Sequence, residues 1–395
     1  MSGACFSPEA PSGVLKKGSP AYQSPKTVVE ILRDLVALER LIPQWEDLAA
    51  DALEPNPFYE HWMLLPALEC FAKRGEVEIL AIWRDGRLAA LFPLQRVARY
   101  KGLPVSALAS WRYRHCLLCT PLLRAEGAVE CLAALSPWLR TQARVLELNY
   151  IPEDGPFHGA LKQAGLLADV SERYERALLV KERDAETYIM GSLSRHLRQE
   201  LRRRERRLAE RGKVAHTVMH PGADLAPWVE EFLRLEAAGW KGREGSALAC
   251  SEANRRFATE VFAAAFERGR LHMVGVDLDG RPLARCCSFL AGEGSFAFKT
   301  AYDEEFSRYS PGVIAEVDRI RQFHALPGVQ WMDSFTAQDN EVLNAVWKGR
   351  RRIARLAIGA GSAGKLVLWT LARLRGAKAL LKRTKGQKNK RGHGR

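Results

Sequence analysis

The sequence has no run of apolar residues that approaches the roughly 20 needed to cross a bilayer, so no transmembrane helix is predicted. The N-terminus lacks the apolar core of a signal peptide, because residues 1–25 are rich in Pro, Ser and Gly. We therefore interpret residues 1–26 as a disordered leader. Without a secretory signal, the eight cysteines are expected to be reduced thiols in a cytoplasmic protein.

A second cysteine pair at zinc-ligand spacing is also missing. Cys116 and Cys119 form a single CxxC motif, preceded by His115. Structural zinc sites take four ligands, commonly from two such pairs, so no metal site is predicted. Cys286 and Cys287 fall within an apolar strand pattern, which favours a place in the core.

Acidic residues are absent after Glu341, while Lys and Arg crowd the same segment. The whole chain has a formal net charge of +14. Such an excess is typical of contact with phosphate groups, an acidic lipid surface or nucleic acid. A solvated, disordered tail is the alternative interpretation.

Two stretches of the chain follow one plan. Residues 77–95 and 271–290 each contain an apolar strand, an Asp-Gly turn, an Arg and a second apolar strand. The Asp-Gly pairs at 85–86 and 279–280 predict hairpins, because a type I′ turn requires positive φ at both central residues. Each hairpin is preceded by a helical pattern and followed by a helix and a final strand.

This repeated order predicts a duplicated α/β unit. We expect two tandem domains, each a mixed, mainly antiparallel sheet flanked by helices. After the leader, the predicted segments are an N-terminal domain (27–185), an Arg-rich linking helix (186–212), a C-terminal domain (213–358) and a basic tail (359–395).

The linking segment shows a helical pattern over residues 192–213, and Ser192 or Ser194 can cap its start. Its leucines form an apolar stripe and most other residues are Arg. A long solvated helix that leans on the core is one interpretation. In the other, four arginines line a groove for a phosphate-bearing donor or a polyanionic acceptor: Arg202, Arg203, Arg206 and Arg207.

Three motifs of the second half resemble a known family. They are LEAAGWKGREGSAL (235–248), FKTAYDEEFSRYSPG (298–312) and NAVWKGRRRI (344–353). In this order they resemble the bacterial CelD-type acyltransferases of the GNAT (Gcn5-related N-acetyltransferase) superfamily, which are associated with cellulose and exopolysaccharide synthesis. The tandem arrangement is similar to that of the FemAB aminoacyltransferases. The resemblance covers roughly residues 50–358 and implies a degenerate first copy and an acyltransferase second copy.

The resemblance also implies a place for the acyl donor. In GNAT folds the fourth strand separates from the fifth, acyl-CoA lies between them, and its diphosphate rests at the start of the next helix. These elements map to residues 295–303, 329–335 and 308–312. The implied co-substrate is acetyl-CoA or another acyl-CoA, and its implied ligands are Tyr302, Arg308, Ser310, Gly312 and Val313.

One departure from the superfamily pattern concerns this loop. GNAT enzymes usually carry Arg/Gln-x-x-Gly-x-Gly/Ala, and this chain has RYSPGV. A helix N-terminus suits phosphate because its first N–H groups have no partner. Pro311 has no N–H to offer, so the cradle has fewer donors than usual. An acyl carrier protein or an aminoacyl-tRNA is the alternative donor.

Acyl transfer needs a base for the acceptor, donors for the tetrahedral oxyanion and a proton for the leaving thiolate. The resemblance places the oxyanion donor at a backbone N–H near residues 301–302. The candidate bases, which could instead be loop caps or ion-pair partners, are Glu236, Asp303 and Glu304. The candidate proton donors to the thiolate are Tyr309 and Ser310.

Lys299 lies within an apolar strand pattern, where an unpaired ammonium group would be costly. If alternation holds, it shares a face with Ala297 and Ala301, opposite the phenylalanines, and contacts donor phosphate or an acidic acceptor. The other predicted substrate-binding residues are Trp240, Lys241, Asp333, Trp347, Arg350 and Arg351. Asp333 is also a fallback base or the partner of one of these arginines.

Within the basic tail, residues 365–395 begin with an amphipathic pattern. Its apolar residues, Leu366, Trp369, Leu371, Leu374 and Leu381, are interleaved with Lys365, Arg373, Arg375, Lys378 and Lys382. Such a segment can lie in the interface of an anionic membrane. RNA contact or disorder fits the charge equally well.

The leading hypothesis is transfer of an acyl group from acyl-CoA, without a metal, to an amine or hydroxyl of a sugar nucleotide or surface-polysaccharide precursor. The partner is then a small-molecule or carbohydrate acceptor, and the protein is cytoplasmic or peripheral on the inner face of the membrane. One alternative is an aminoacyl-tRNA-dependent transferase of FemAB type. The other is a non-catalytic GNAT-like scaffold that binds nucleic acid or membrane.

Overall fold

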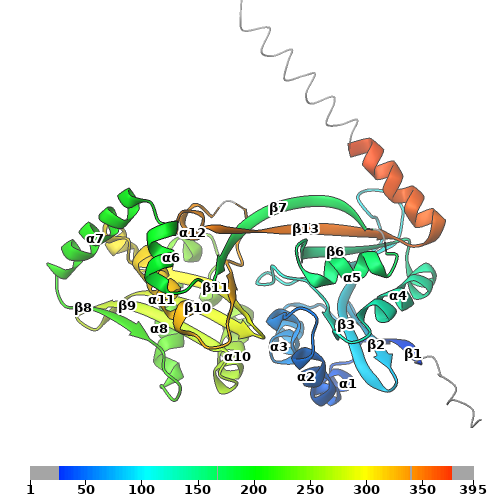
Figure 1. The fold of residues 1–395 in the computed structure, drawn as a ribbon. Helices are drawn as coiled ribbons and strands as arrows, with labels where there is room; N and C mark the ends of the chain where they lie inside the picture. The colour runs from blue at the N-terminus through cyan, green and yellow to red at the C-terminus, as the bar shows by residue number, and fades with distance from the viewer. Residues whose placement is uncertain (1–25, 167, 339, 376–395) are drawn as a thin grey trace, which may run out of the picture.

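The computed structural model describes residues 26–166, 168–338 and 340–375. The leader up to residue 25 and the end of the basic tail, residues 376–395, lie outside this part. Within it, 13 strands form one mixed sheet with helices on its two faces (Figure 1). The α/β class that the sequence predicts is confirmed.

The first half contains seven strands in the described residues. They are β1 (Thr27–Leu32), β2 (Val77–Arg84), β3 (Arg87–Val97), β4 (Ala107–Ser110), β5 (Leu122–Leu123), β6 (Val145–Pro152) and β7 (Ala168–Val180). Its helices are α1 (Leu35–Arg40), α2 (Ile42–Ala50), α3 (His61–Phe71), α4 (Ala128–Gln142) and α5 (Pro156–Gln163), with a short 3-10 helix η1 (Pro57–Tyr59) before α3.

Two helices, α6 (Ala185–Ser192) and α7 (Arg195–Ala209), connect the halves. The strands of the second half are β8 (Val214–Val218), β9 (Leu271–Leu278), β10 (Arg281–Ala291), β11 (Gly294–Tyr302), β12 (Trp331–Asp333) and β13 (Gly349–Gly359). Its helices are α8 (Leu225–Ala238), α9 (Trp240–Arg243), η2 (Leu248–Cys250), α10 (Glu252–Glu267), η3 (Glu304–Tyr309), α11 (Pro311–Ala325) and α12 (Glu341–Val346), and a further helix covers residues 361–375.

The order of strands across the sheet reflects the duplication. It runs β1-β2-β3-β4-β6-β13-β7-β12-β11-β10-β9-β8. From one edge, the first half contributes the edge strand β1, the hairpin β2–β3 and the strands β4 and β6. From the other edge, the second half contributes the edge strand β8, the hairpin β9–β10 and the strands β11 and β12. The strands of the pairs β4–β6 and β11–β12 are parallel, as expected where a helix connects them.

Both predicted hairpins are present and are built alike. Each Asp-Gly turn has positive φ at both central residues, 51° and 79° in the first and 50° and 80° in the second. The Asp85 carboxylate accepts a hydrogen bond from the Lys26 N–H at 3.0 Å, and the Asp279 carboxylate accepts one from the Lys213 N–H at 2.8 Å. Each turn therefore also fixes the start of its neighbouring edge strand.

The final strand of each half lies in the sheet of the other half. β13 pairs with β6 of the first half, and β7 pairs with β12 of the second. The two exchanged strands also pair with each other over ten residue positions, from Gly349 to Ile358. The predicted domain limits at 185 and 213 therefore describe the chain order, whereas the sheet runs continuously across them.

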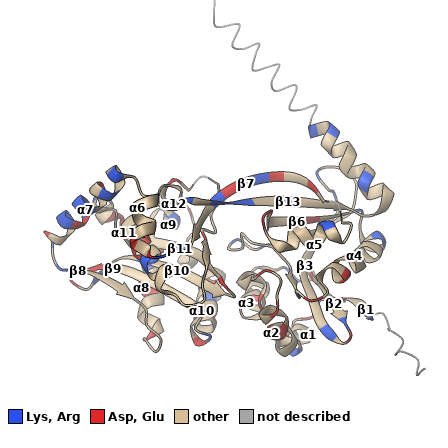
Figure 2. Ribbon diagram, viewed as in Figure 1, with Lys and Arg blue, Asp and Glu red and all other residues tan. Residues whose placement is uncertain are grey.

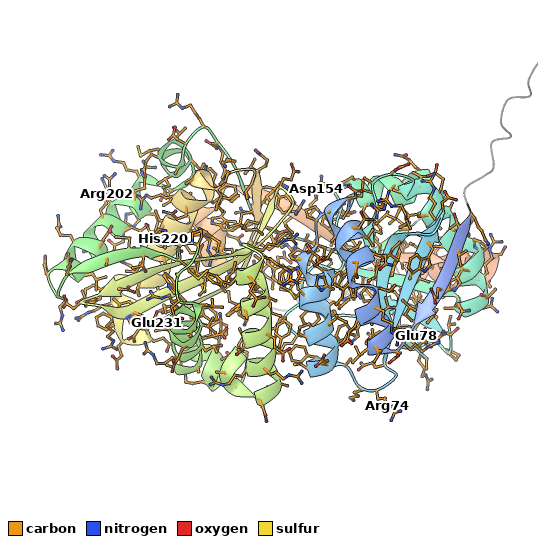
Figure 3. The ribbon with its side chains drawn as sticks, turned by 90° about the horizontal axis from the view of Figure 1, so that it is seen from below. Arg74, Glu78, Asp154, Arg202, His220 and Glu231 are labelled. Atoms are coloured by element: carbon orange, nitrogen blue, oxygen red, sulfur yellow. The ribbon has the colours of Figure 1, made fainter. Side chains whose placement is uncertain are left out.

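The linking segment is two helices rather than one. α6 ends at Ser192, and α7 begins after Ser194, whose side chain accepts a hydrogen bond from the Leu197 N–H at 3.1 Å. Leu201 and Leu208 are buried, as the apolar stripe predicts. Arg202 lies on the outer side of α7 (Figure 3).

One hydrophobic core crosses the boundary between the halves. It joins α3 of the first half to α10 and α8 of the second, beneath one face of the sheet (Figure 3). α6, α7 and α11 lie on the opposite face of the second half. Among the described helices, none combines the length and apolar character that crossing a bilayer requires.

Candidate functional site

The sheet opens where β11 and β12 separate. The two strands pair in parallel over three positions, from Gly294–Trp331 to Phe296–Asp333. β12 then ends, whereas β11 continues to Tyr302. A cavity of about 630 Å³ lies in this opening. The separation that the resemblance implies for the fourth and fifth strands is therefore present in the structure.

The start of α11 forms one end of the cavity. Ser310 precedes the helix with a φ of 53°, a left-handed conformation that turns the chain sharply into the helix. Among the described residues, no group accepts a hydrogen bond from the Gly312 N–H. A Cβ on Gly312 would lie 3.1 Å from the Tyr302 ring, so a side chain here would require that ring to shift by a few tenths of an ångström.

A side chain from the linking segment reaches the same end of the cavity. Arg204 of α7 donates a hydrogen bond to Ser310 Oγ. Its guanidinium adds positive charge beside the N-terminus of α11, where the helix dipole is also positive. The arginines that the sequence singled out on this helix differ from Arg204, and among them Arg203 pairs with Glu200 at 2.7 Å.

Four of the five predicted donor ligands line the cavity: Tyr302, Ser310, Gly312 and Val313. Arg308 does not line it. Its guanidinium lies 4.7 Å from the centre of the Tyr309 ring and donates to the Tyr309 hydroxyl at 2.7 Å. Tyr309 is buried in the core between α11 and the sheet. Of the two candidate proton donors, Ser310 lines the cavity and Tyr309 does not.

A buried ion cluster lies against β11 on the α8 side. Glu236 is 2% exposed and accepts hydrogen bonds from Lys299 at 2.9 Å and from the Leu248 N–H at 2.8 Å. Lys241 lies 3.4 Å from the same carboxylate and donates to the Thr300 carbonyl at 2.9 Å. The carboxylate thus holds two ammonium groups at the cavity wall, while Glu236 itself is enclosed.

The charged groups of this cluster shift one another's pKa values. Burial opposes ionisation of Glu236, but the ammonium groups of Lys299 and Lys241 outweigh it and lower its pKa. Burial and the nearby charge of Lys299 lower the pKa of Lys241. A cavity with two ammonium groups and one enclosed carboxylate is suited to an anionic or electron-rich ligand.

Lys299 lies on the face opposite to the one that strict alternation predicts. The pairing of β10 with β11 shifts between Cys287 and Ser288, and Phe298 is left without a partner there. This β-bulge interrupts the period of two, so Lys299 turns to the α8 face together with Phe298 and Ala301. Ala297 lies on the other face of β11. The prediction that Lys299 shares a face with both alanines is therefore correct for Ala301 and wrong for Ala297.

A second polar network supports β11 from the α11 side. The Thr300 hydroxyl donates to Glu316 Oε1 at 2.8 Å and accepts from Arg319 at 3.0 Å. Arg319 also donates to the Lys299 carbonyl at 3.3 Å. The two networks hold the part of β11 that has lost β12 as a neighbour, and neither Glu316 nor Arg319 was singled out from the sequence.

The first half contributes a wall of the cavity. Arg114, His115 and Leu117 line it, from the segment after β4. His115 is buried, lies 2.9 Å from the Asn254 amide oxygen and stacks 5.7 Å from Phe257. The sequence motif of this segment, a single CxxC preceded by a histidine, indicates no role in the cavity. Its Cys116 and Cys119 are buried free thiols, and no metal-binding group of three is found in the described residues.

The buried His115 is expected to make the free energy of unfolding depend on pH. Burial and then the nearby Lys299 charge lower its pKa to about 4. Because the unfolded pKa is about 6.5, the neutral ring contributes stability that is present above pH 6.5 and is lost as the pH falls towards 4. We expect a loss of about 3 kcal/mol from this group over that range. In chemical denaturation at pH 7.5 and 4.5, His115→Gln should lose less stability than the wild type, and equal losses would contradict the prediction.

Asp303 and Glu304 lie outside the main cavity. The Asp303 carboxylate accepts from the Glu305 N–H at 3.0 Å and pairs with Arg281, so it caps η3. The Glu304 carboxylate accepts from the Trp240 N–H at 2.7 Å and pairs with Arg243 at 2.8 Å. Both carboxylates therefore perform the capping and ion-pairing roles that were their alternatives. Trp240 and Lys241 themselves line the cavity.

Asp333 is fully buried behind the cavity wall. Its carboxylate pairs with Arg176 of β7 at 2.6 Å and with Arg351 of β13 at 3.2 Å. Trp347 is buried in the core around α6 and α11, and Arg350 donates to the carbonyls at the end of α12. Four predicted substrate-binding residues therefore do not line the cavity: Asp333, Trp347, Arg350 and Arg351. Asp333 is instead the ion-pair partner of an arginine, which is the alternative that its sequence position allows.

A second hollow of about 270 Å³ adjoins the cavity, and both are bordered by Leu117 and Ala337. Its walls include Asn149, Tyr150 and Tyr174 from the exchanged-strand region. Tyr150 has a φ of 50° and, like Phe335 at 52° beside the main cavity, follows the parallel pairing of its own half. Non-glycine residues in this conformation are uncommon and cluster at functional sites.

Comparison with known proteins agrees with this geometry. Residues 195–342 match the family model described as "Acetyltransferase (GNAT) domain". The match lies in the second half of the chain. The matched range contains α7, β11 and the start of α11, and therefore most of the cavity wall. No curated protein matches the chain in sequence.

Two solved structures, with TM-scores above 0.5, share the fold over most of the chain. A conserved protein of unknown function from Bacteroides thetaiotaomicron is 10% identical, with a TM-score of 0.53 over 84% of this chain and 100% of its own. FemX is 13% identical, with a TM-score of 0.52 over 86% and 99%. A tandem GNAT protein from the clavulanic acid biosynthesis pathway is 14% identical, with a TM-score of 0.42 over 85% and 99%. At these identities the likeness concerns the fold alone.

Proposed function

We propose that this protein is an acyltransferase that moves an acyl group from acyl-CoA to an amine or hydroxyl of a sugar nucleotide or surface-polysaccharide precursor. The observation that carries the proposal is the cavity between β11 and the end of β12, which opens at the N-terminus of α11. The resemblance of the three sequence motifs to CelD-type acyltransferases supports the acceptor class.

The donor diphosphate would lie against Ser310 and Gly312. The free Gly312 N–H and the positive end of the α11 dipole favour an anion there. Pro311 removes one of the usual N–H donors, and the guanidinium of Arg204 supplies positive charge at the same place. The thioester would then extend along β11, whose edge towards the cavity has no strand partner after Phe296.

The acceptor would occupy the neighbouring hollow. Tyr150 and Tyr174 present aromatic rings 6.3 Å apart, which suit the apolar face of a sugar ring. Arg112 stacks on Tyr150 at 5.2 Å, and Arg114 extends from the same segment to the main cavity. These two exposed arginines would bind phosphate groups of the acceptor.

Proton transfer is assigned to groups that line the cavity. Glu316 is the carboxylate that does so among the described residues, and its Oε2 has no hydrogen-bond partner there. In the proposal Glu316 takes the proton of the attacking amine or hydroxyl, and the carboxylic acid so formed returns a proton to the leaving thiolate. Lys299 and Lys241 stabilise negative charge that develops beside β11.

A thiol-release screen tests the proposal. Acyl-CoAs of increasing chain length are incubated with the protein and a panel of nucleotide sugars, and free CoA is measured. We expect release that requires one acceptor, and we expect Glu316→Gln to lower kcat by roughly 100-fold with CoA affinity unchanged. Glu304→Gln is the matched control and should retain activity. Absence of CoA binding and of thiol release would contradict the proposal.

A further inference from the structure

The helix at residues 361–375 is anchored to the first half by one face. Leu368 and Leu371 are buried, and they pack with Val145 and Ala357 of the sheet and with Tyr100 of the loop after β3. The end of the helix is held by an ion pair between Arg375 and Asp169. The helix is therefore part of the folded body, at one end of the elongated molecule (Figure 1).

The opposite face of this helix is apolar and exposed. Leu366, Trp369 and Leu374 are 62%, 58% and 48% exposed. At 3.6 residues per turn these side chains project away from Leu368 and Leu371, so the same helix presents two apolar faces. A face of this kind with no partner in the described chain indicates an interaction surface.

Basic charge accompanies the exposed face. Figure 2 shows Lys and Arg positions in blue on this helix. The Arg373 guanidinium is 5.1 Å from the Trp369 ring. No acidic residue follows Glu341 in the sequence, and eight Lys and Arg lie in residues 376–395, beyond the described part. The helix therefore leads directly into a strongly cationic segment.

We propose that this face is a docking surface for an anionic phospholipid membrane, with Leu366 and Trp369 in the headgroup–acyl boundary and the basic residues on the headgroups. A tryptophan between leucines suits that boundary, because its ring is apolar and its N–H stays near water. Contact with a nucleic acid would use the positive charge but would leave the exposed leucines without a function. Charge complementarity with the cationic segment selects an anionic lipid surface over a neutral one.

Vesicle flotation of the full chain tests the surface. The probes are vesicles of phosphatidylcholine alone and vesicles in which phosphatidylglycerol replaces one lipid in three. We expect the protein to float with the anionic vesicles at least tenfold more than with the neutral ones, and increasingly less as salt is added. Leu366→Ser with Trp369→Ser should reduce the bound fraction about tenfold. Both residues are exposed, so the melting temperature should not change.

A matched control carries Val36→Ser and Met190→Ser, which remove two exposed apolar side chains from other surfaces. This control should bind vesicles like the wild type. Equal binding of the Leu366/Trp369 variant, or equal binding to neutral vesicles, overturns the proposal. Binding of single-stranded RNA and self-association of the chain are measured as the alternative uses of this surface. If the variant loses RNA binding or self-association while vesicle binding is absent in all forms, the proposal is also overturned. These readouts do not depend on acyl transfer.

Discussion

Replacement of Gly312 by aspartate is expected to weaken CoA binding about 100-fold, which corresponds to about 2.7 kcal/mol. The new Cβ would lie 3.1 Å from the Tyr302 ring, and the new carboxylate would lie where the diphosphate is proposed to bind. An acidic residue in the first turn of a helix is favourable for the helix itself, so the protein should remain folded. Calorimetric titration with CoA and a thermal melt measure the two effects separately.

Gly159→Asp is the control for this experiment. Gly159 lies in the first turns of α5, a helix that also begins with proline, and no atom lies within 4 Å of its added Cβ. This variant introduces the same charge at a similar helical position away from the cavity, and it should bind CoA like the wild type. If Gly312→Asp also binds CoA like the wild type, the proposed donor site at the start of α11 is wrong.

Replacement of Asp333 by alanine is expected to lower the free energy of unfolding by about 3–5 kcal/mol. Asp333 and Arg176 are both fully buried, and truncation of the carboxylate leaves the Arg176 guanidinium without its counter-ion. Urea denaturation measures the loss. The matched control is Glu172→Ala on β7, which removes a carboxylate that is 59% exposed and pairs with Arg355 at 2.9 Å. Its expected cost is about 0–1 kcal/mol.

The buried Asp333 is also expected to make the free energy of unfolding depend on pH at the acidic end of the range. Burial opposes its ionisation, but Arg176 and Arg351 outweigh burial and lower the pKa of the carboxyl group. Its contribution to stability is present above the unfolded pKa of about 3.9 and is lost as the pH falls through the lower folded pKa. The stability difference between wild type and Asp333→Ala should therefore shrink below pH 4. A difference that stays constant down to pH 2 would contradict this assignment.

Local chemistry explains which elements the sequence predicts well. Both hairpins follow from the positive φ that an Asp-Gly turn requires, and the start of α7 follows from a serine that can cap it. The separation of β11 from β12 was placed by motif resemblance, because short motifs retain their position in a fold. These features depend on residues close together in the chain.

Distant pairings explain what could not be predicted. His115 meets Asn254 across 139 positions, and Arg176 meets Asp333 across 157. No local pattern distinguishes the arginine that will lie in the core from those that remain in solvent. The face of Lys299 depends on a β-bulge, which strict alternation cannot reveal.

The sequence by itself determined that the chain contains a repeated α/β unit, where its turns lie, and that its end is basic and amphipathic. Only the tertiary structure decided that β7 and β13 exchange between the halves, that the first half supplies His115 and Arg114 to the cavity of the second, and that Leu366 and Trp369 face outward. The physical reason is the range of the interactions. Turns, caps and periodicity are encoded within a few residues, whereas strand partners, buried ion pairs and the choice of exposed face depend on the packing of segments far apart in the chain.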